Sequence, residues 1–190
     1  DELDRILGLD LSGQPDLDLA RDNFLLDCYI GLRIADYKNL REHHIIEIEG
    51  TKMIKIRLQK TGNIAVVPLN KKALKILEKR NYDFSTYGEY KTNILIKEVG
   101  KLAGIDEPFI KTITLGGKVV EQEFKKYEKI THHTARRSFA TNLYLEGVPT
   151  LDIMQMTGHT TEKAFLRYIR VTPEQTAIRV SKMHAYFSVD

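Results

Sequence analysis

The sequence predicts an α+β domain that is mostly helical and holds a small three-stranded antiparallel sheet. Apolar residues recur at helical spacing in several segments, whereas between residues 43 and 69 the pattern changes to a period of two. The chain has 190 residues, of which 42% are apolar and 29% charged. This length and composition predict one globular domain with a sizeable core, over residues 1–190.

The first 41 residues predict three helices. Residues 1–15 predict a short helix and a loop, and residues 16–30 a longer helix with apolar members at Leu19, Phe24, Leu26 and Ile30. Gly31 ends that helix, as a glycine after a helix C-terminus does, and residues 34–41 predict another short helix. Because the chain starts inside a helical pattern, we expect it to be a fragment that lacks an N-terminal neighbour.

Three short segments then predict the sheet. They alternate or run apolar, and turns at Gly50-Thr51 and Thr61-Gly62 separate residues 43–50, 52–59 and 63–69. Helical patterns return at residues 70–80 and 87–103, the second closed by Gly104.

The last third predicts a hairpin followed by helices. Residues 108–130 hold two β-rich runs around Gly116-Gly117. After Thr131 the pattern is helical, with breaks at residues 147–149, at Gly158 and at residues 172–173. Residues 173–187 predict an amphipathic tail helix.

Charge and cysteine content narrow the class of protein. Residues 1–50 carry five Lys/Arg and twelve Asp/Glu, and the remaining residues carry twenty-four and fourteen, so a net −7 precedes a net +10. A basic body favours a polyanion partner, although ordinary surface scatter would explain it about as well. Cys28 is the only cysteine, which excludes an internal disulfide or a Cys-based zinc site and fits a reducing cytoplasm. No signal peptide and no apolar run long enough for a bilayer is visible.

One ordered set of residues indicates chemistry. His133 and Arg136 form a His-x-x-Arg at the predicted start of a helix, so they share a face. His159 follows Gly158 downstream, and Tyr168 comes nine residues after His159, on the helix predicted to begin near Thr160. Alone, each has an ordinary interpretation as a capping, core or surface residue. Tyr144 and Tyr186, the rival tyrosines, are interpreted as packing residues.

Two upstream cations complete the set. Arg33 lies just after Gly31, at a predicted corner between two helices, where its side chain can point outward. Asp36, three residues on, could orient it. Lys60 lies in the predicted turn between the second and third strands. A lone surface arginine or turn lysine is usually only solvated.

These residue types suit a phosphodiester. Charge develops on the non-bridging oxygens in its transition state, and arginine binds such oxygens bidentately without losing its proton. A tyrosine, with a pKa of about 10, becomes a nucleophile when its proton is removed and the phenolate is stabilised. An ammonium in a hairpin turn can protonate the departing sugar oxygen. The set therefore predicts cleavage and rejoining of DNA without a metal or cofactor.

Four segments in this order resemble the tyrosine recombinase, or phage integrase, family. GLRIADYKNL resembles its first-arginine segment, QKTGNIAVVPL its hairpin-lysine segment, and HHTARRSFATNLYLEGV its His-x-x-Arg segment, with Arg137 where many members have His. MTGHTTEKAFLRYIRV resembles the segment with Gly-His and the tyrosine. Nearly all of the chain is similar to the C-terminal catalytic domain, the DNA breaking-rejoining enzyme fold. The amino-acid sequence as a whole is also similar to those of integrases of bacterial mobile elements, including conjugative transposons.

The resemblance implies roles and partners. Tyr168 would form a 3′-phosphotyrosyl bond, while Arg33, Arg136 and His159 stabilise the transition state. Lys60 would act as the general acid, and His133 as an acid/base or donor. The partners implied are double-stranded DNA and further copies of the chain, in a tetrameric synapse held by the tail helix. Packing of the tail on its own domain is nearly as good an interpretation. The family's N-terminal DNA-clamping domain has no counterpart here, and a bacterial cytoplasmic, nucleoid-associated protein is expected.

Three other functions stay open. A relative that binds DNA but has lost catalysis would give no covalent adduct. A type IB topoisomerase uses similar residues but would relax any supercoiled plasmid. An unrelated hydrolase or metal enzyme is disfavoured, because the chain has neither G-x-S-x-G nor H-E-x-x-H.

Overall fold

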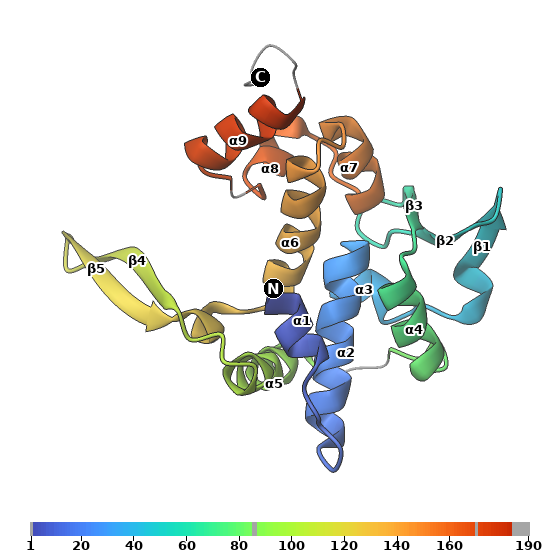
Figure 1. Ribbon diagram of the computed structural model, residues 1–190, viewed down its shortest axis with the longest axis horizontal. Helices are drawn as coiled ribbons and strands as arrows, with labels where there is room; N and C mark the ends of the chain where they lie inside the picture. Colours follow the sequence, from blue (N-terminus) through green and yellow to red (C-terminus); the bar gives the residue numbers. More distant parts are fainter. Residues whose placement is uncertain (1, 85–86, 170, 184–190) are drawn as a thin grey trace. The chain divides into compact units, whose positions relative to one another are not determined.

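The chain divides into two compact units. The computed structural model describes residues 2–84, 87–169 and 171–183 (Figure 1). Unit 1 comprises residues 1–25 and 85–134, and unit 2 comprises residues 26–84 and 135–190. The composition predicted one domain, and each of these units has buried apolar residues of its own.

Unit 1 is built on helices. It contains α1 (Glu2–Leu7), the first part of α2 (Pro15–Ile30), α5 (Glu89–Leu102) and the 3-10 turn η2 (Lys126–Lys129). Arg5 donates from Nη1 to the carbonyl of Gly104 at 2.6 Å and from Nη2 to Glu107 at 2.8 Å, which fastens α1 to the end of the α5 segment. The apolar residues buried in this unit include Ile6, Phe24, Ile96, Val99, Ile105 and Ile130.

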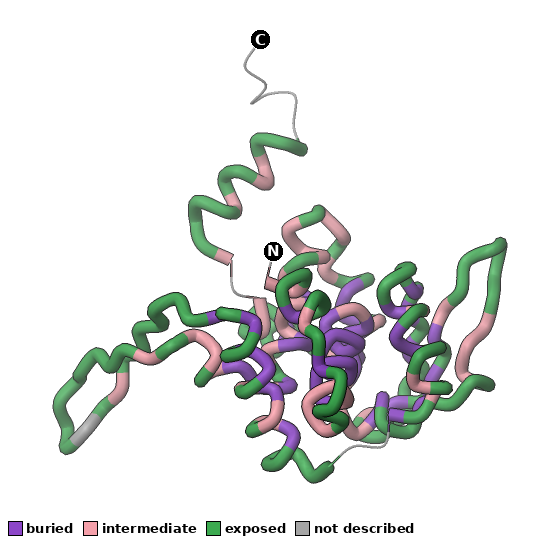
Figure 2. Tube along the Cα trace, turned by 60° about the horizontal axis from the view of Figure 1, so that its bottom comes forward, coloured by how far each residue is buried: buried purple, intermediate pink, exposed green. Residues whose placement is uncertain are grey.

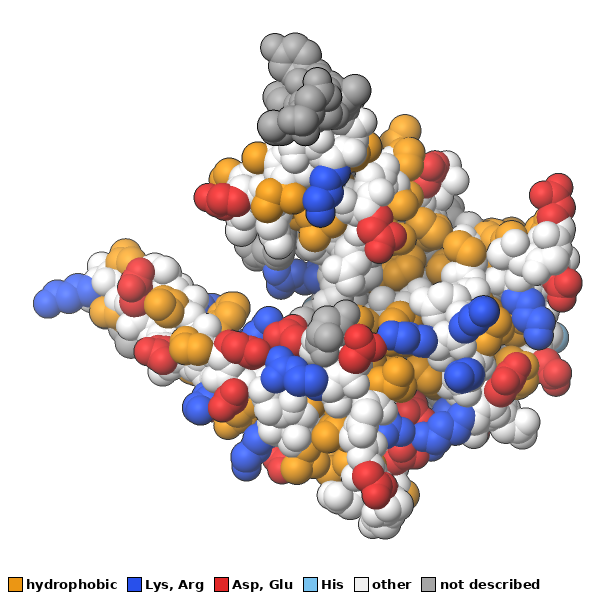
Figure 3. All heavy atoms as spheres, in the orientation of Figure 1, with side chains coloured by type: hydrophobic (Ala, Val, Ile, Leu, Met, Phe, Trp, Pro, Cys, Tyr) orange, Lys and Arg blue, Asp and Glu red, His pale blue; other side chains and the backbone are white. Residues whose placement is uncertain are grey.

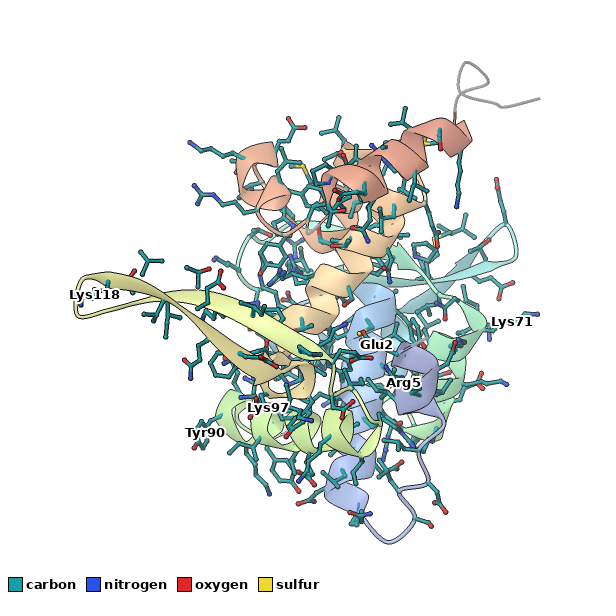
Figure 4. The ribbon with its side chains drawn as sticks, turned by 60° about the vertical axis from the view of Figure 1, so that its left-hand side comes forward. Glu2, Arg5, Lys71, Tyr90, Lys97 and Lys118 are labelled. Carbon is teal, nitrogen blue, oxygen red and sulfur yellow. The ribbon has the colours of Figure 1, made fainter. Side chains whose placement is uncertain are left out.

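A two-stranded hairpin extends from unit 1. It joins β4 (Pro108–Leu115) and β5 (Lys118–Lys125) in an antiparallel register that pairs Phe109 with Phe124 and Thr114 with Val119. This confirms the hairpin predicted around Gly116-Gly117, both of which have positive φ. Most of the hairpin is exposed (Figure 2), and charges of both signs lie beside apolar side chains on it (Figure 3). Lys118 stands at its tip, while Tyr90 and Lys97 project from α5 (Figure 4).

Unit 2 contains the predicted three-stranded antiparallel sheet, in the order β1-β2-β3. Its strands are β1 (Ile45–Ile48), β2 (Thr51–Arg57) and β3 (Ile64–Pro68). Alternate residues of β2 and β3 are buried, as the period of two predicts: Ile54, Ile56, Ala65 and Val67. Helix α4 (Lys71–Lys79) follows β3, and the Asn70 side chain caps it by accepting from the Ala73 N–H at 2.8 Å.

Two predicted boundaries in unit 2 were wrong. Helix α3 spans only Ile34–Tyr37, not residues 34–41, because the Asn39 side chain donates to the Ala35 carbonyl at 2.8 Å and the chain turns there. The first strand begins at Ile45 rather than residue 43. Residues 42–44 form a 3-10 turn, η1 (Glu42–His44), in which His44 Nδ1 accepts the Arg41 N–H at 3.1 Å.

Between residues 132 and 183, the part of the C-terminal region that the structure describes apart from residue 170, the helices are α6 (His132–Leu145), α7 (Thr150–Thr157), α8 (Glu162–Leu166) and α9 (Pro173–Met183). From Ala135 on they belong to unit 2, where α7 contacts α8 and β3. Ala140, Ile153, Met154 and Phe165 form their buried core. Arg179 of α9 donates to the Tyr144 carbonyl and hydroxyl, each at 3.3 Å, so the tail helix packs on its own unit. Residues 184–187 of the predicted tail helix lie outside the described residues.

The α+β class is therefore confirmed. Among the described residues, no helix is both long and apolar enough to cross a membrane.

Candidate active site

Arg33 stands at the corner between α2 and α3, as predicted. Gly31 has a φ of +62°, and a Cβ on it would lie 2.1 Å from Cδ1 of Phe139, so the corner needs glycine for its conformation and for space. Arg33 itself is extended, with φ −72° and ψ 149°, and immediately precedes α3. Its Nη1 atom is buried and makes no hydrogen bond. This nitrogen lies 3.8 Å from the position a Cβ of Gly158 would take.

Arg136 is held deep in unit 2 by two helix ends. Only 2% of the residue is exposed. Nη1 donates to the Gly31 carbonyl at 2.8 Å, and Nη2 donates to the Thr157 carbonyl. Gly31 follows the last residue of α2 and Thr157 ends α7, so both carbonyls carry the partial negative charge of a helix C-terminus. The guanidinium is thus fixed, and its Nε atom is buried without a hydrogen bond.

The environment of Arg136 shifts its pKa in two opposite directions. Burial and the positive charge of Arg33 lower the pKa of Arg136 to about 10, while Asp27, Tyr168 and Asp36 act in the other direction. Arg136 therefore stays protonated near neutral pH. The proximity of two arginines and the bare N–H donors favour an anion at this place.

His159 follows a glycine turn at the end of α7. Gly158 has a φ of +68°, and a Cβ on it would meet Cδ1 of Leu58 at 2.1 Å. His159 Nδ1 lies 2.8 Å from the Thr157 hydroxyl. Burial, Arg136 and Arg33 together lower the pKa of His159 to about 4, so the imidazole is neutral at pH 7. A cavity of about 520 Å³ opens beside it, between β3 and α7.

Tyr168 lies beside these residues. The prediction that it lies on a helix was wrong: α8 ends at Leu166, and Tyr168 is in the following turn, where its N–H donates to the Phe165 carbonyl at 2.7 Å. Its ring centroid is 4.8 Å from that of His159, with the rings at 65°. The guanidinium carbon of Arg136 is 5.9 Å from the same ring. The structure thus brings Tyr168, His159, Arg136 and Arg33 together within one unit.

Lys60 occupies the turn between β2 and β3, as predicted, and is exposed. The residues before it fix the base of the turn. The Gln59 N–H donates to Asp36 Oδ1 at 2.8 Å, and Gln59 Nε2 donates to the Ala35 carbonyl at 2.7 Å. Leu58, by its contact with Gly158, joins the strand end to the His159 turn. The Lys60 turn is therefore tied to the elements that carry Arg33 and His159.

His133 is the sixth predicted residue. It lies in the first turn of α6, three residues before Arg136 in sequence, and is exposed. It belongs to unit 1, whereas the other five belong to unit 2.

Sequence reasoning missed two buried polar residues of this site. Thr157 is fully buried, and its hydroxyl and carbonyl serve His159 and Arg136. Asp27 is 1% exposed, and its Oδ1 atom makes no hydrogen bond. Burial raises the pKa of Asp27 well above its usual range, while the charge of Arg136 opposes this shift. One signal could have found Asp27. It lies within the apolar run FLLDCYI, where a carboxylate cannot be explained as an ordinary surface residue.

Comparison with known proteins defines the class to which this fold belongs, the catalytic domain of tyrosine recombinases. A profile described as the phage integrase family matches residues 16–175. The chain therefore belongs to the phage integrase family. Among curated proteins, none matches the chain in sequence.

Solved structures show the same fold at low sequence identity. XerA recombinase is 18% identical with a TM-score of 0.65, over 97% of this chain and 63% of that one. XerH recombinase bound to its palindromic difH substrate is 16% identical with a TM-score of 0.66, over 95% and 49%. The Tn1549 transposon integrase with circular intermediate DNA is 15% identical with a TM-score of 0.55, over 94% and 61%. The chain thus spans less than two thirds of the length of these proteins.

Proposed function

We propose that this chain cleaves and rejoins DNA strands as a site-specific recombinase, through a covalent bond between Tyr168 and a 3′-phosphate. One observation carries the proposal. Tyr168 lies in one unit with two arginines whose buried N–H groups, Arg33 Nη1 and Arg136 Nε, have no hydrogen-bond partner. Buried donors are rarely left unsatisfied, and a phosphate oxygen is the acceptor that an arginine pair fits best.

The proposed step is a transesterification. The Tyr168 oxygen attacks phosphorus and the bond from phosphorus to the 5′-oxygen breaks, which gives a 3′-phosphotyrosine and a free 5′-hydroxyl. Arg33 and Arg136 stabilise the charge that develops on the non-bridging oxygens. Lys60 gives a proton to the departing 5′-oxygen, and His133 assists as an acid/base or donor. The phosphotyrosine keeps the energy of the original ester, so the reverse attack by a 5′-hydroxyl needs neither ATP nor a cofactor.

The partners proposed are double-stranded DNA and further copies of the chain. XerH and the Tn1549 integrase were solved with DNA, and lambda integrase as a tetramer bound to a Holliday junction. For this chain we propose a tetrameric synapse in which the tail helix α9 contacts a neighbour. Ile178, which is exposed on α9, supports this role. We also propose that the chain comes from a bacterial mobile element and acts in the cytoplasm.

Covalent trapping tests the reaction. The chain is incubated with nicked duplexes of randomised sequence, from which the short cleaved strand diffuses away, and adducts are separated in denaturing gels. We expect an adduct whose peptide map contains phosphotyrosine at Tyr168. Tyr168→Phe should abolish the adduct and leave DNA retardation unchanged, because only the attacking oxygen is removed.

The control is Tyr144→Phe, which removes the hydroxyl of another half-buried tyrosine of the same unit and should leave trapping unchanged. An adduct mapped to another residue would move the nucleophile elsewhere. DNA binding with no adduct on any duplex would favour the silent DNA-binding relative. Relaxation of plasmids of unrelated sequence would favour the topoisomerase.

A further inference from the structure

Asp27 is a buried carboxyl for which its own helix offers no counter-charge. It lies in the last turn of α2, where only 1% of the residue is exposed, and its Oδ1 atom makes no hydrogen bond. A helix C-terminus carries partial negative charge, so a carboxylate there is disfavoured, and this turn of α2 contains no basic residue. Burial adds to the cost of the charge. The compensating group must therefore come from another part of the fold.

Arg136 of α6 is that group. The Gly31 N–H donates to the Asp27 carbonyl at 2.8 Å, and the Gly31 carbonyl accepts from Arg136 Nη1, also at 2.8 Å. The guanidinium is thus bound to the residue that closes the Asp27 turn, and each of the two charges shifts the pKa of the other. Asp27 Oδ1 and Arg136 Nε are both buried without a hydrogen bond. Between these two atoms the attraction is therefore one of charge alone.

Two other titratable groups lie near Asp27, Tyr37 of α3 and the adjacent Cys28. Burial, and after it the charge of Asp27, raises the pKa of each well above its usual range, so both are neutral near pH 7. Arg136 is the charged group whose effect on the pKa of Asp27 opposes that of burial. A change in the charge around Arg136 should consequently change the pKa of Asp27.

The charges around Arg136 decide what such a change would be. Arg33 and Arg136 carry one positive charge each, and Asp36 carries one negative charge. His159 is neutral at pH 7, because its pKa is lowered to about 4. With Asp27 ionised, this group has no net charge to attract a phosphodiester. With Asp27 protonated, the group has one net positive charge, which matches the single negative charge of a phosphodiester.

We propose that Asp27 is a positioning residue that acts through Arg136. Its carboxylate offsets the charge of the arginine pair in the free protein, and it takes up a proton from solvent when a DNA phosphate binds to that pair. This inference rests on the proposed function, since it takes Arg33 and Arg136 as the phosphate site. It adds a residue that touches neither the DNA nor the attacking tyrosine, but sets how strongly the arginine pair attracts an anion.

The proton uptake gives a pH dependence of known sign. A bound phosphate offsets the charge of Arg136, the group that lowers the pKa of Asp27, so this pKa is higher in the complex than in the free protein. The complex therefore holds up to one more proton, and low pH favours it. DNA affinity should fall as pH rises, by up to about tenfold per pH unit in the range between the two pKa values.

NMR of the free protein tests the pair without any reaction. Carbon-13 of the Asp27 carboxyl, assigned from its loss in Asp27→Asn, is followed against pH together with nitrogen-15 of Arg136 Nε. Sodium sulfate is the probe, because sulfate does not titrate near neutral pH, and sodium chloride at the same ionic strength is the control. We expect sulfate to move the Arg136 signal and to raise the titration midpoint of Asp27 by roughly half a pH unit or more.

Single-turnover cleavage of the trapping substrates at several pH values supplies the second readout. For the wild-type chain, the DNA concentration at half-saturation should rise with pH. Asp27→Asn keeps the shape of the side chain but cannot ionise, so its half-saturation should be about tenfold or more below that of wild type at the alkaline end, with a weaker pH dependence. Asp27→Ser serves if the asparagine variant does not fold.

The matched control is Asp22→Asn. Asp22 is another buried carboxyl of α2, but it belongs to unit 1 and is paired with Arg21 Nε at 3.0 Å. Since this carboxyl has a cation other than Arg136 as its partner, the variant should keep the pH dependence of wild type.

The possible failures are distinguishable. Sulfate that moves the Arg136 signal but leaves the Asp27 midpoint in place would overturn this inference alone, and so would an Asp27→Asn variant with the pH dependence of wild type. Sulfate that moves neither signal would exclude the arginine pair as an anion site, which overturns the inference and the proposed function together. Both sulfate shifts without any Tyr168 adduct would support the role of Asp27 and contradict only the cleavage reaction.

Discussion

Arg136 and Lys60 are both cations of the candidate site, but Arg136 is 2% exposed whereas Lys60 lies in an exposed turn. Two backbone carbonyls fix both terminal nitrogens of Arg136. Around Lys60, the hydrogen bonds fix the backbone and side chain of the preceding residue, Gln59. The guanidinium of Arg136 is therefore fixed directly by hydrogen bonds, whereas Lys60 is positioned only through the base of its turn.

This difference matches two chemical tasks. A group that stabilises charge at phosphorus works best when it is fixed before the reaction, because it then needs no reorganisation. A group that transfers a proton to a leaving oxygen must come within hydrogen-bonding reach of an atom that moves away. Burial suits the first task, and an anchored but exposed turn suits the second. Substitutions at the two sites should consequently differ in their effect on stability.

The largest effect is expected from Arg136→Ala. It leaves the Gly31 and Thr157 carbonyls without their donor and Asp27 without a neighbouring cation, so we expect unfolding to become easier by roughly 3 kcal/mol or more. Cleavage should fall by about 10³ or more, as loss of a transition-state donor does. Urea unfolding and single-turnover cleavage measure the two effects.

Arg136→Lys separates the two effects, since lysine keeps the charge but cannot bridge both carbonyls. It should fold, with native-like circular dichroism, and still lose about a hundredfold or more in cleavage. Near-normal cleavage by the lysine variant would contradict the fixed, two-pronged role of Arg136.

A smaller and purely catalytic effect is expected from Lys60→Ala. Since the side chain is exposed, stability should change by less than about 0.5 kcal/mol. Cleavage should fall by about a hundredfold, as for loss of a general acid. A substrate with sulfur in place of the bridging 5′-oxygen should restore the rate, because a thiolate leaves without a proton. An equally slow reaction of the sulfur substrate would remove Lys60 from the proton-transfer step.

How far the site could be predicted from sequence differs between these two regions. Lys60 was placed correctly in a turn, because period-two patterns on either side determine the hairpin locally. Arg33 at its corner followed likewise from Gly31. Tyr168 was placed on a helix, because the sequence does not reveal that α8 ends at Leu166.

The interior of the site was less accessible to such reasoning. The contacts of Arg136 join residues 105 and 21 positions apart, and Thr157 looks like an ordinary residue at the end of a helix. No local sequence pattern indicates that its carbonyl accepts from Arg136 while its hydroxyl contacts His159. The division into two compact units likewise has no local sequence signal, since α2 and α6 each continue across the boundary.

The smallest effect is expected from the tie at the base of the Lys60 turn. Gln59→Ala removes the 2.7 Å bond to the Ala35 carbonyl but leaves the backbone bond to Asp36. A hydrogen bond contributes roughly 0.5–1.5 kcal/mol, so we expect about twofold to tenfold slower cleavage of the oxygen substrate. The loss acts through Lys60, so the sulfur substrate should react at the wild-type rate.

Gln122→Ala is the matched control, because it truncates an exposed glutamine on β5 in unit 1 and should leave both substrates unaffected. Equal slowing of the oxygen and sulfur substrates by Gln59→Ala would mean that the tie orients Arg33, which shares the α2–α3 corner with Ala35, rather than Lys60. In that case the exposed turn and Arg33 would depend on the same support, and the contrast between Lys60 and Arg136 would rest on burial alone.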